Sequence, residues 1–492
     1  MSRLLPALLV VAMFPLLWPA ACARVDPNRR FVLDVAQALG GVDRVTALKS
    51  IAVEGEGDAP LLGQNRTPDS DPPNWKVTGY RRVTDLANDR TDMQQVRTVQ
   101  FLFARLPVQR QHQALDGAVA FDVTPDGVAR RVGGQQVMER RAEMLRHPIT
   151  AVRAALAEGA VVTNRRSQGD DDVIDVSTAH GDVLTLAVSR DTRLPTSVTT
   201  RATNANLGDV TIVTAFAEYE DVSGVKMPRR LTTRLDKYLQ FDLRVSRNAV
   251  DVEPAAAAAP QAVRSAPEPE PAEVSVVVEP VAKGVWWLAG PVNHRSSVVE
   301  FDDHLLLFEA GLNESRSKAV IKAARALSPK PLTQAVVSHH HFDHSGGLRV
   351  AVAEGLTIIT HRLNEPFFRE LLVRPWTIEP DDLARNPRAP TFQLVDDTLT
   401  LKDSSMELRL YHLLDNPREG TNLFGYIPKH RLLLQADLYD NTWEQHPWGQ
   451  NSLDNIKRRG LPVDRSIPVH GAIDSFAGMV RTIAARPALS PN

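Results

Sequence analysis

The sequence predicts an α/β protein in two parts, in which a separate β-rich (α+β) domain precedes a domain of alternating strands and helices. At 492 residues the chain is too long for one hydrophobic core. Residues 253–273 are dominated by Pro, Ala and Glu, a composition that cannot bury apolar surface and is typical of an extended, semi-rigid linker. We therefore expect an N-terminal domain over residues 24–252 and a C-terminal domain over residues 274–492 that folds independently of it.

The first 23 residues have the pattern of a signal peptide that is cleaved after export. Arg3 precedes an apolar stretch over residues 4–18, and small residues follow it. A second interpretation stays open, because Ala-Ala-Cys at residues 20–22 resembles the end of a lipobox, although Pro19 departs from that motif. We expect an exported, periplasmic protein, either free or anchored to the membrane as a lipoprotein through Cys22.

The charge balance and the cysteine content exclude several kinds of partner and site. Basic and acidic residues are balanced, 57 against 59, so no basic excess points to nucleic acid and no acidic excess points to a basic partner. The single cysteine excludes an intramolecular disulfide and a thiolate metal site. No other segment reaches the ~18 uninterrupted apolar residues of a transmembrane helix. We expect a small-molecule substrate as the partner, and the oligomeric state stays open.

The N-terminal domain is expected to be two helices followed by a sheet. Apolar residues recur at helical spacing over residues 31–39, before Gly40-Gly41, and a shorter helix is expected up to Leu48. Period-two patterns predict strands at residues 51–53, 96–103, 183–188, 210–215 and 239–245. The strand rhythm of residues 184–195 and 208–228 resembles the curved sheets of periplasmic lipoprotein-carrier proteins. The three histidines of this domain are far apart in sequence and are expected to be surface or core residues: His112, His147 and His180.

Strands and helices alternate in the C-terminal domain, which holds eleven of the fourteen histidines. The predicted strands are residues 285–288, 297–301, 305–308, 333–338, 356–360, 392–395, 408–412, 423–427 and 432–435. The predicted helices are residues 314–327, 347–354 and 475–484.

A histidine-rich motif follows one of these predicted strands. Residues 339–344 read His-His-His-Phe-Asp-His, after the apolar run 334–337 and before Gly346-Gly347. At a strand end that opens a helix, side chains from one turn can converge on one point. Neutral imidazole and carboxylate are the ligands that Zn²⁺ and similar divalent ions prefer. The motif therefore predicts a metal site.

The spacing H-x-H-x-D-H resembles the signature of the metallo-β-lactamase superfamily. The resemblance implies four metal ligands in this motif: His339, His341, Asp343 and His344. It also implies an αββα sandwich for the C-terminal domain, which the order of predicted strands and helices suits. The implied activity is metal-dependent hydrolysis, with one or two Zn²⁺ ions or another divalent metal as cofactor.

The resemblance implies further ligands downstream, and one of them is missing. Asp437 ends the apolar run 432–436 and resembles the aspartate that bridges two metals in the family. A carboxylate at the end of a buried strand is costly unless a cation or a donor compensates it. His470 resembles the last histidine of the family. Where the family has a third histidine for the first metal, this chain has Arg418, whose guanidinium has no lone pair to give.

The second metal keeps a complete ligand set, namely Asp343, His344, Asp437 and His470. His412 is an alternative third ligand for the first metal, whereas His361 and His446 are expected to lie at the surface. Three interpretations stay open: one metal at the second position, two metals with the first bound weakly, or a site without catalysis. We favour an enzyme with one metal, or with a second one weakly bound.

The expected reaction is attack of a metal-bound hydroxide on an ester, lactone, lactam, thioester or phosphoester. Asp343 would hold the metal and orient the hydroxide, and Arg418 could bind an anionic group of the substrate through two parallel N–H···O bonds. The alternative is a periplasmic lipid- or lipoprotein-binding protein whose metal site is structural or vestigial. An iron-dependent redox role is disfavoured, because no glycine motif for flavin or nicotinamide accompanies the site.

Overall fold

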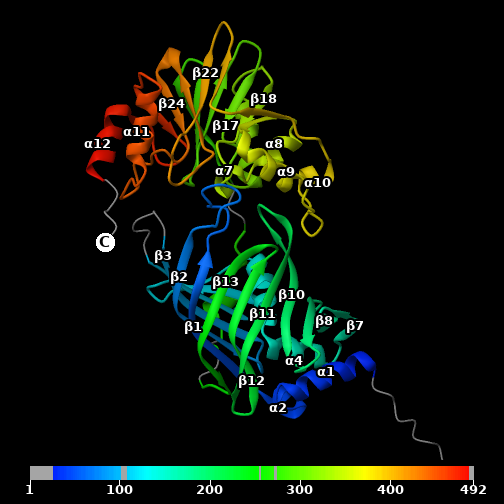
Figure 1. Ribbon diagram of the computed structural model, residues 1–492. Helices are drawn as coiled ribbons and strands as arrows, with labels where there is room; N and C mark the ends of the chain where they lie inside the picture. Colours follow the sequence, from blue (N-terminus) through cyan, green and yellow to red (C-terminus); the bar gives the residue numbers. More distant parts are fainter. Residues whose placement is uncertain (1–25, 101–107, 254–255, 257, 271–273, 487–492) are drawn as a thin grey trace, which may run out of the picture.

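The structure is a computed structural model that describes residues 26–100, 108–253, 256, 258–270 and 274–486. The expected signal peptide and Cys22 lie outside these residues. The described chain forms a β-rich N-terminal domain and a C-terminal αββα domain, so the predicted fold class is confirmed (Figure 1). Among the described residues, no helix is long and apolar enough to cross a membrane.

The N-terminal domain is built on one strongly curved sheet of 13 strands (Figure 1). The strand order is β6-β5-β4-β3-β2-β1-β13-β12-β11-β10-β9-β8-β7, and all neighbouring strands are antiparallel. The strands are β1 Ser50–Pro60, β2 Asn74–Asp85, β3 Arg90–Val99, β4 Gln109–Asp116, β5 Val119–Val123, β6 Ala129–Arg131, β7 Val161–Gln168, β8 Asp171–Ser177, β9 Val183–Ser189, β10 Pro195–Asn204, β11 Gly208–Val222, β12 Val225–Leu235 and β13 Tyr238–Val250.

Four helices pack against this sheet: α1 Pro27–Ala38, α2 Val42–Ala47, α3 Gly134–Leu145 and α4 Pro148–Leu156. The sequence explains how α1 begins, because the Asp26 side chain accepts a hydrogen bond from the Asn28 amide and a proline occupies the first helical position. Its apolar stripe, which includes Phe31 and Val35, is buried in the same core as Ile149 of α4 and strand residues of the sheet.

The local predictions for this domain are largely confirmed. The two predicted helices are α1 and α2, and four of the five predicted strands lie within β1, β9, β11 and β13. The strand predicted at residues 96–103 overlaps β3, which ends at Val99, and residues 101–107 lie outside the described part of the chain.

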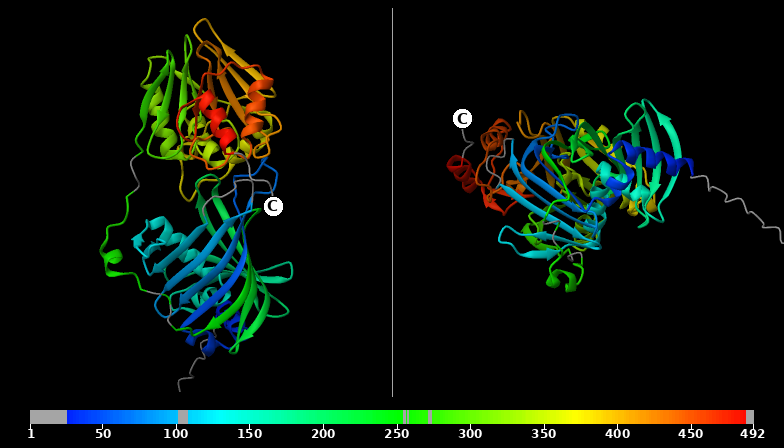
Figure 2. Two further views of the ribbon diagram at one scale, coloured as in Figure 1. Left: turned by 90° about the vertical axis from the view of Figure 1, so that its left-hand side faces the viewer. Right: turned by 90° about the horizontal axis from the view of Figure 1, so that it is seen from below.

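The linker between the domains is not wholly extended. Residues Gln261–Ser265 form the short helix α5. Ala259 and Val263 are buried against Ala114 and Phe121 of the large sheet. The expectation that this segment buries no apolar surface was therefore wrong, because small side chains between its prolines fit against the sheet. The chain then runs along the outside of the molecule towards the C-terminal domain (Figure 2).

The C-terminal domain has four layers. Two sheets enclose one core, to which the first contributes Phe308 and Val336 and the second contributes Leu410 and Leu434. Helices α6 and α8 cover the outer face of the first sheet, and α11 and α12 cover the outer face of the second (Figure 1). The helices are α6 Glu314–Arg325, α7 Phe342–Ser345, α8 Leu348–Ala353, α9 Glu365–Val373, α10 Asp382–Arg385, α11 Gly449–Arg458 and α12 Phe476–Ala485, with 3-10 turns η1 Arg362–Asn364 and η2 Pro428–His430.

The first sheet has seven strands in chain order, antiparallel from β14 to β17 and parallel from β17 to β20. The second has six, in which only the β24–β25 pair is parallel. The strands are β14 Val277–Ala282, β15 Val285–Ala289, β16 Ser296–Glu300, β17 Leu305–Phe308, β18 Leu332–Val336, β19 Thr357–His361, β20 Phe392–Val395, β21 Thr398–Lys402, β22 Glu407–His412, β23 Leu423–Ile427, β24 Leu432–Gln435, β25 Arg465–Pro468 and β26 Asp474–Ser475. Every strand and helix predicted for this domain overlaps one of these elements.

Contacts in two regions of the interface join the domains. The loop of residues 61–73 between β1 and β2 rises to α7, where the Phe342 amide donates to the Gly63 carbonyl oxygen at 3.1 Å (Figure 1). On another side of the interface, the Asp209 carboxylate accepts the amides of Thr377 and Ile378 at 2.9 and 3.1 Å.

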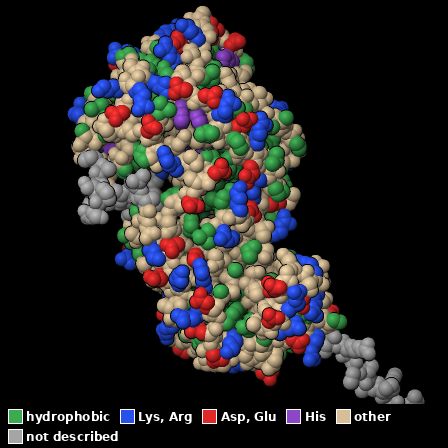
Figure 3. Space-filling model, in the orientation of Figure 1, with side chains coloured by type: hydrophobic (Ala, Val, Ile, Leu, Met, Phe, Trp, Pro, Cys, Tyr) green, Lys and Arg blue, Asp and Glu red, His purple; other side chains and the backbone are tan. Residues whose placement is uncertain are grey.

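Apolar surface is also shared across this interface. Leu207 and Ile212 of the N-terminal domain belong to the same hydrophobic cluster as Phe368 and Leu371 of α9. Each domain has a core of its own, but this cluster is shared between them, whereas the linker alone predicted independent domains. Charged side chains of both signs are interspersed over the face that Figure 3 shows, which agrees with the balanced composition.

Candidate metal centre

The candidate metal centre lies where strand ends of the C-terminal domain meet, at the edge that faces the N-terminal domain. The structure brings together all six residues expected to bind metal, namely His339, His341, Asp343, His344, Asp437 and His470. The first four follow β18 and lie in or just before α7. The other two each stand two residues beyond a strand, β24 or β25. Strand ends from both sheets thus direct these side chains to one place.

Four of these side chains form a compact group that matches the second metal position. The Nε2 atoms of His344 and His470 are 3.1 Å apart. Each Nε2 lies 3.2 Å from Asp437 Oδ1 and 3.3 Å from Asp343 Oδ2. Ligands bound tetrahedrally at about 2.0–2.1 Å are themselves about 3.3 Å apart. These five distances are close to that spacing, and His344, Asp437 and His470 form a group that could hold a metal ion.

A second group, at the first metal position, includes a residue that the sequence interpretation missed. His339 Nε2 and His341 Nδ1 each lie 3.8 Å from Glu419 Oε1, and His339 Nε2 lies 4.0 Å from Asp437 Oδ2. Glu419 thus supplies a carboxylate to the two histidines where the family resemblance called for a third histidine. Its place next to Arg418, in the stretch that lacked a ligand, was the available signal.

The side chains at the first metal position are deeply buried, and some of their polar atoms make no hydrogen bond. His339 and His341 have no exposed surface, and Glu419 is 1% exposed. His339 Nε2 and His341 Nδ1 have no hydrogen-bond partner among the described residues. A buried polar atom left unpaired costs about 1–3 kcal/mol, and a cation between the donors removes that cost. Imidazole nitrogens and carboxylate oxygens in this arrangement fit a divalent metal ion.

The charges in the second group balance one another. Burial alone would lower the pKa of His470, but Asp437 and Asp343 outweigh it and raise the pKa to about 10. Burial is opposed in the same way at His344, whose pKa lies well above its ordinary value. Protons on the two histidines thus compensate the two carboxylates, and a bound cation would displace those protons.

The first group has a different charge state. Burial holds the pKa of His339 and of His341 well below the ordinary value, so both rings are neutral and offer a lone pair. Burial and the charge of Asp437 raise the pKa of Glu419, and the charge of Arg418 opposes this shift. Arg418 is the permanent positive charge next to this group.

The guanidinium of Arg418 is engaged by carboxylates of the protein. Its Nε lies 2.6 Å from Glu419 Oε1, its Nη2 lies 3.0 Å from Asp437 Oδ2, and its side chain is 8% exposed. It also lies 5.2 Å from the ring centroid of Trp448. The sequence led us to expect a cation that faces the substrate, whereas here the guanidinium compensates two carboxylates of the site.

Contacts behind the ligands orient them. Glu309, which follows β17, accepts the Ser338 amide at 2.7 Å and lies 3.2 Å from His344 Nδ1. The Nδ1 of His470 lies 2.6 Å from the Asn293 carbonyl oxygen. Such partners fix which nitrogen of each ring carries the proton, and they leave Nε2 to face the site.

His294 is a further buried side chain that the sequence did not single out. It is 1% exposed, and neither ring nitrogen has a hydrogen-bond partner among the described residues. Its ring centroid lies 5.3 Å from that of His344 and 5.0 Å from that of His470. It stands before β16, far from the motif in sequence.

Other candidate histidines lie outside the donor groups found in the described chain. The Nε2 of His412 lies 3.0 Å from the Gly420 carbonyl oxygen, and its ring is 4.0 Å from that of His361. The expectation that His361 and His446 lie at the surface was wrong, since they are 5% and 3% exposed. His361 is held by a contact of 3.0 Å to the Asp396 carbonyl oxygen, and His446 stacks on Tyr439.

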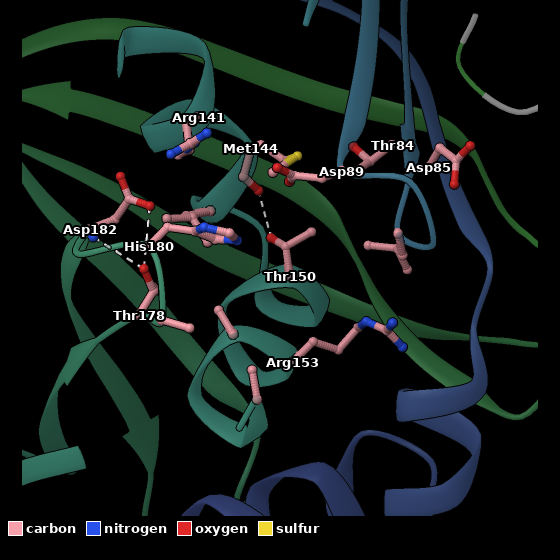
Figure 4. Close-up of a pocket in the computed structure, with 15 residues that line it drawn as sticks. Thr84, Asp85, Asp89, Arg141, Met144, Thr150, Arg153, Thr178, His180 and Asp182 are labelled. Atoms are coloured by element: carbon pink, nitrogen blue, oxygen red, sulfur yellow. Dashed lines mark hydrogen bonds between the residues drawn. The ribbon is translucent and has the colours of Figure 1, made fainter. Parts of the chain in front are cut away.

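The N-terminal domain contains cavities, but the described residues there form no comparable donor group. One cavity of about 270 Å³ lies beside α3 and α4 (Figure 4). Polar groups that line it bond to one another, since Thr150 Oγ1 donates to the Met144 carbonyl oxygen at 2.6 Å and the Asp182 amide donates to Thr178 Oγ1 at 3.1 Å. His180 lines this cavity.

A larger cavity of about 540 Å³ lies on the concave side of the 13-stranded sheet. Its walls combine apolar side chains, among them Met93, Ile212 and Leu243, with charged ones such as Arg97 and Glu139. Leu62 of the β1–β2 loop and Phe342 of α7 also line it, so it ends next to the metal centre.

Comparisons with known proteins concern the C-terminal domain. Residues 289–420 match the family model described as the metallo-beta-lactamase superfamily. A search of curated proteins finds no match.

Several solved structures are similar to part of the chain. A metallo-beta-lactamase from Pontibacter korlensis is 14% identical, with a TM-score of 0.34, over 43% of this chain and 98% of that one. A metallo beta lactamase from Hirschia baltica is 13% identical, with a TM-score of 0.35, over 44% of this chain and 99% of that one. A metal-soaked flavodiiron core from Synechocystis is 14% identical, with a TM-score of 0.36, over 44% of this chain and 61% of that one.

The family match confirms the predicted resemblance for the C-terminal part and indicates a metal-dependent hydrolase. The matched residues include the motif and Glu419, whereas Asp437 and His470 lie beyond them. The roles of Asp437 and His470 therefore depend on the distances given above. The resemblance of the N-terminal domain to lipoprotein carriers stays a prediction.

Proposed function

Because residues 289–420 match the metallo-beta-lactamase superfamily, we propose that this protein is an exported zinc-dependent hydrolase. Its substrate would be an ester, lactone, lactam, thioester or phosphoester. The observation that carries the proposal is the second donor group, in which the Nε2 atoms of His344 and His470 lie 3.1 Å from each other and each lies 3.2–3.3 Å from an oxygen of Asp437 and an oxygen of Asp343.

The residues of the metal centre would have different roles in this reaction. Asp343, His344, Asp437 and His470 would hold the principal metal ion. When bound, zinc supplies Lewis acidity and lowers the pKa of a coordinated water to about 7. Asp343 would also orient the attacking water, because its Oδ1 is held by a hydrogen bond of 2.9 Å from Gln64 while its Oδ2 faces the two histidines.

A second ion would bind more weakly at the first position. The nitrogens of His339 and His341 each lie 3.8 Å from the Glu419 oxygen, which is wider than in a tetrahedral zinc site, and Arg418 already pairs with that carboxylate. Metal binding at Glu419 would release the guanidinium from that carboxylate. Arg418 could then bind an anionic group of the substrate, the role that we proposed for it from the sequence.

The test is hydrolysis by the purified full-length protein with defined metal content. A panel of chromogenic esters, lactones, lactams, thioesters and phosphoesters would be assayed before and after metal is removed with a chelator. We expect turnover of one class, loss of that turnover on chelation, and recovery when zinc is added. Turnover that is unchanged in Asp343→Ala would contradict the proposed site.

The cavity of about 540 Å³, which has both apolar and charged side chains in its walls, favours a second candidate function, the binding of a lipid or a lipoprotein acyl chain. Its volume lies within the range of small-molecule sites, about 300–1,000 Å³. In that case the metal site would be structural. A fluorescent fatty acid that binds the protein, together with no turnover across the panel at full metal occupancy, would favour this alternative.

A further inference from the structure

The β1–β2 loop of the N-terminal domain, residues 61–73, contacts the metal centre through several groups. We propose that this loop is an integral part of the metal centre and that Gln64 is a positioning residue for it. The inference rests on the proposed metal site, but it assigns a role to the N-terminal domain that the metal-binding motif does not contain.

Gln64 contacts both metal positions, through Asp343 at the second and Arg418 beside the first. Its Nε2 donates to Asp343 Oδ1 at 2.9 Å, and its Oε1 accepts from Arg418 Nη2 at 2.8 Å. A carboxamide offers a donor and an acceptor on one rigid plane, so one side chain can hold an anion and a cation at a set separation. Gln64 thereby turns Asp343 Oδ2 towards His344 and draws Arg418 away from the space between the histidines.

The main chain of the loop acts on His341. The Nε2 of this ring lies 2.8 Å from the Asn65 carbonyl oxygen. A carbonyl oxygen only accepts, so Nε2 carries the proton and Nδ1 presents its lone pair towards Glu419. A histidine that binds metal through one nitrogen almost always donates its other N–H to such a partner. Here that partner comes from the other domain.

Two main-chain hydrogen bonds hold the loop in place. The Gly63 carbonyl oxygen accepts the Phe342 amide at 3.1 Å, and the Arg66 carbonyl oxygen accepts the Gly420 amide at 2.7 Å. Gly63 has φ 78°, and a Cβ at this position would lie 2.3 Å from the Phe342 ring. The close approach of the loop to α7 therefore requires glycine at this position. The same loop contributes Leu62 to the wall of the cavity of about 540 Å³.

The test compares zinc binding by the full-length wild type, Gln64→Ala and Gln64→Glu, with a chelating dye as competitor. Partners behind metal ligands typically change metal affinity about 10–100-fold, and we expect a loss of that size in Gln64→Ala. Gln64→Glu keeps the acceptor for Arg418 but places a carboxylate beside Asp343, so we expect its zinc affinity to change as well. Where a substrate is known, kcat should fall more than KM changes, because Asp343 is misplaced.

The matched control is Gln111→Ala, which removes a glutamine contact of 2.6 Å to Gln95 elsewhere in the same domain. It should leave zinc affinity unchanged. A variant with an Asn-Gly turn in place of residues 62–72 removes the Asn65 carbonyl as well, and it should bind zinc more weakly than Gln64→Ala.

Wild-type zinc affinity in both Gln64→Ala and the shortened-loop variant would overturn the proposal. So would a loss of thermal stability in Gln64→Ala without a loss of zinc affinity, because that result assigns the loop to interdomain packing alone. Zinc affinity is measured without a substrate. A protein that binds zinc tightly yet hydrolyses nothing would therefore contradict the proposed function and leave this inference intact.

Discussion

Two sets of buried polar groups, one in each domain, are paired differently. In the N-terminal domain, Arg140 is 7% exposed and donates to the carbonyl oxygens of Ala114 and Phe121 at 2.8 and 2.7 Å. In the C-terminal domain, the free nitrogens of His339 and His341 face a carboxylate oxygen at 3.8 Å, beyond hydrogen-bond distance.

The difference indicates how buried polar groups that stabilise the fold can be distinguished from those that form a binding site. Groups that serve the fold lie at hydrogen-bond distance, because an unpaired buried group is costly. Polar groups that converge but stay beyond hydrogen-bond distance leave room for a bound ion between them. The same contrast appears between single histidines. The Nδ1 of His147 caps α4 by accepting the Ile149 amide, whereas the histidines of the metal centre lie beside carboxylates in groups that could hold a metal ion.

Loss of a second-position ligand should have the largest effect. We expect His344→Ala to lose most of the bound zinc, because it removes one of four donors from the compact group. The measurement is zinc per protein after dialysis against a defined buffer. The matched control is His112→Ala, which removes a histidine paired with Asp92 at 2.7 Å in the N-terminal domain. Equal zinc content in His344→Ala and the wild type would show that His344 does not bind the metal, and that unclosed polar groups do not mark a metal site here.

Loss of Arg418 should have the next largest effect. Arg418→Gln leaves buried carboxylates without their counter-charge, which should lower the unfolding free energy of the zinc-free protein by about 3 kcal/mol. Zinc should restore much of this loss, because the cation replaces the charge. The measurement is denaturant unfolding with and without zinc.

Arg349→Gln is the matched control for Arg418. Arg349 and Asp381 form a buried ion pair, with Nε 2.6 Å from Oδ2, outside the metal centre. Zinc should not restore stability in this variant. If zinc has the same effect in both variants, Arg418 does not neutralise metal ligands.

The titration of His147 should have a smaller effect on the free energy of unfolding. Burial and the nearby Arg82 lower the pKa of His147 from 6.5 to about 3. As the pH falls below 6.5, the unfolded state takes up the proton and the folded state does not, so stability is present above that pH and is lost below it. The loss between pH 7 and pH 5 should be about 2 kcal/mol.

His147→Asn keeps a side-chain acceptor at the start of α4 and removes the titration. We therefore expect its stability to fall about 2 kcal/mol less than that of the wild type between pH 7 and pH 5. Urea unfolding at both values measures the difference. Parallel losses in the two proteins would show that His147 becomes protonated in the folded state.

Cleavage of the linker should have the smallest effect. With a protease site inserted after Glu270, the two pieces should stay together on gel filtration and keep their zinc. The Asp209 contacts with Thr377 and Ile378 and the loop over the metal centre hold them. Separation of the pieces with full zinc retention would contradict both the interface and the proposed role of the loop.

Much of the C-terminal domain was predictable, because its signals are local. The strands predicted at residues 392–395, 423–427 and 432–435 coincide with β20, β23 and β24. A strand end followed by a polar residue marks Asp437 and His470 for the same reason, since the apolar run and the charge stand next to each other in the chain. The linker was mispredicted because its average composition concealed the few small side chains that pack.

The sequence by itself determined the two-part fold class and the motif after β18, because periodicity acts over a few residues. The six expected metal ligands were implied by the family resemblance that the motif carries. Only the tertiary structure decided that Glu419 faces His339 and His341, since Arg418 and Glu419 look equally placed in the sequence. It also decided that Gln64 reaches Asp343 across a separation of 279 residues. No local pattern can signal such a contact, because it exists only where the curved sheet and the sandwich pack against each other.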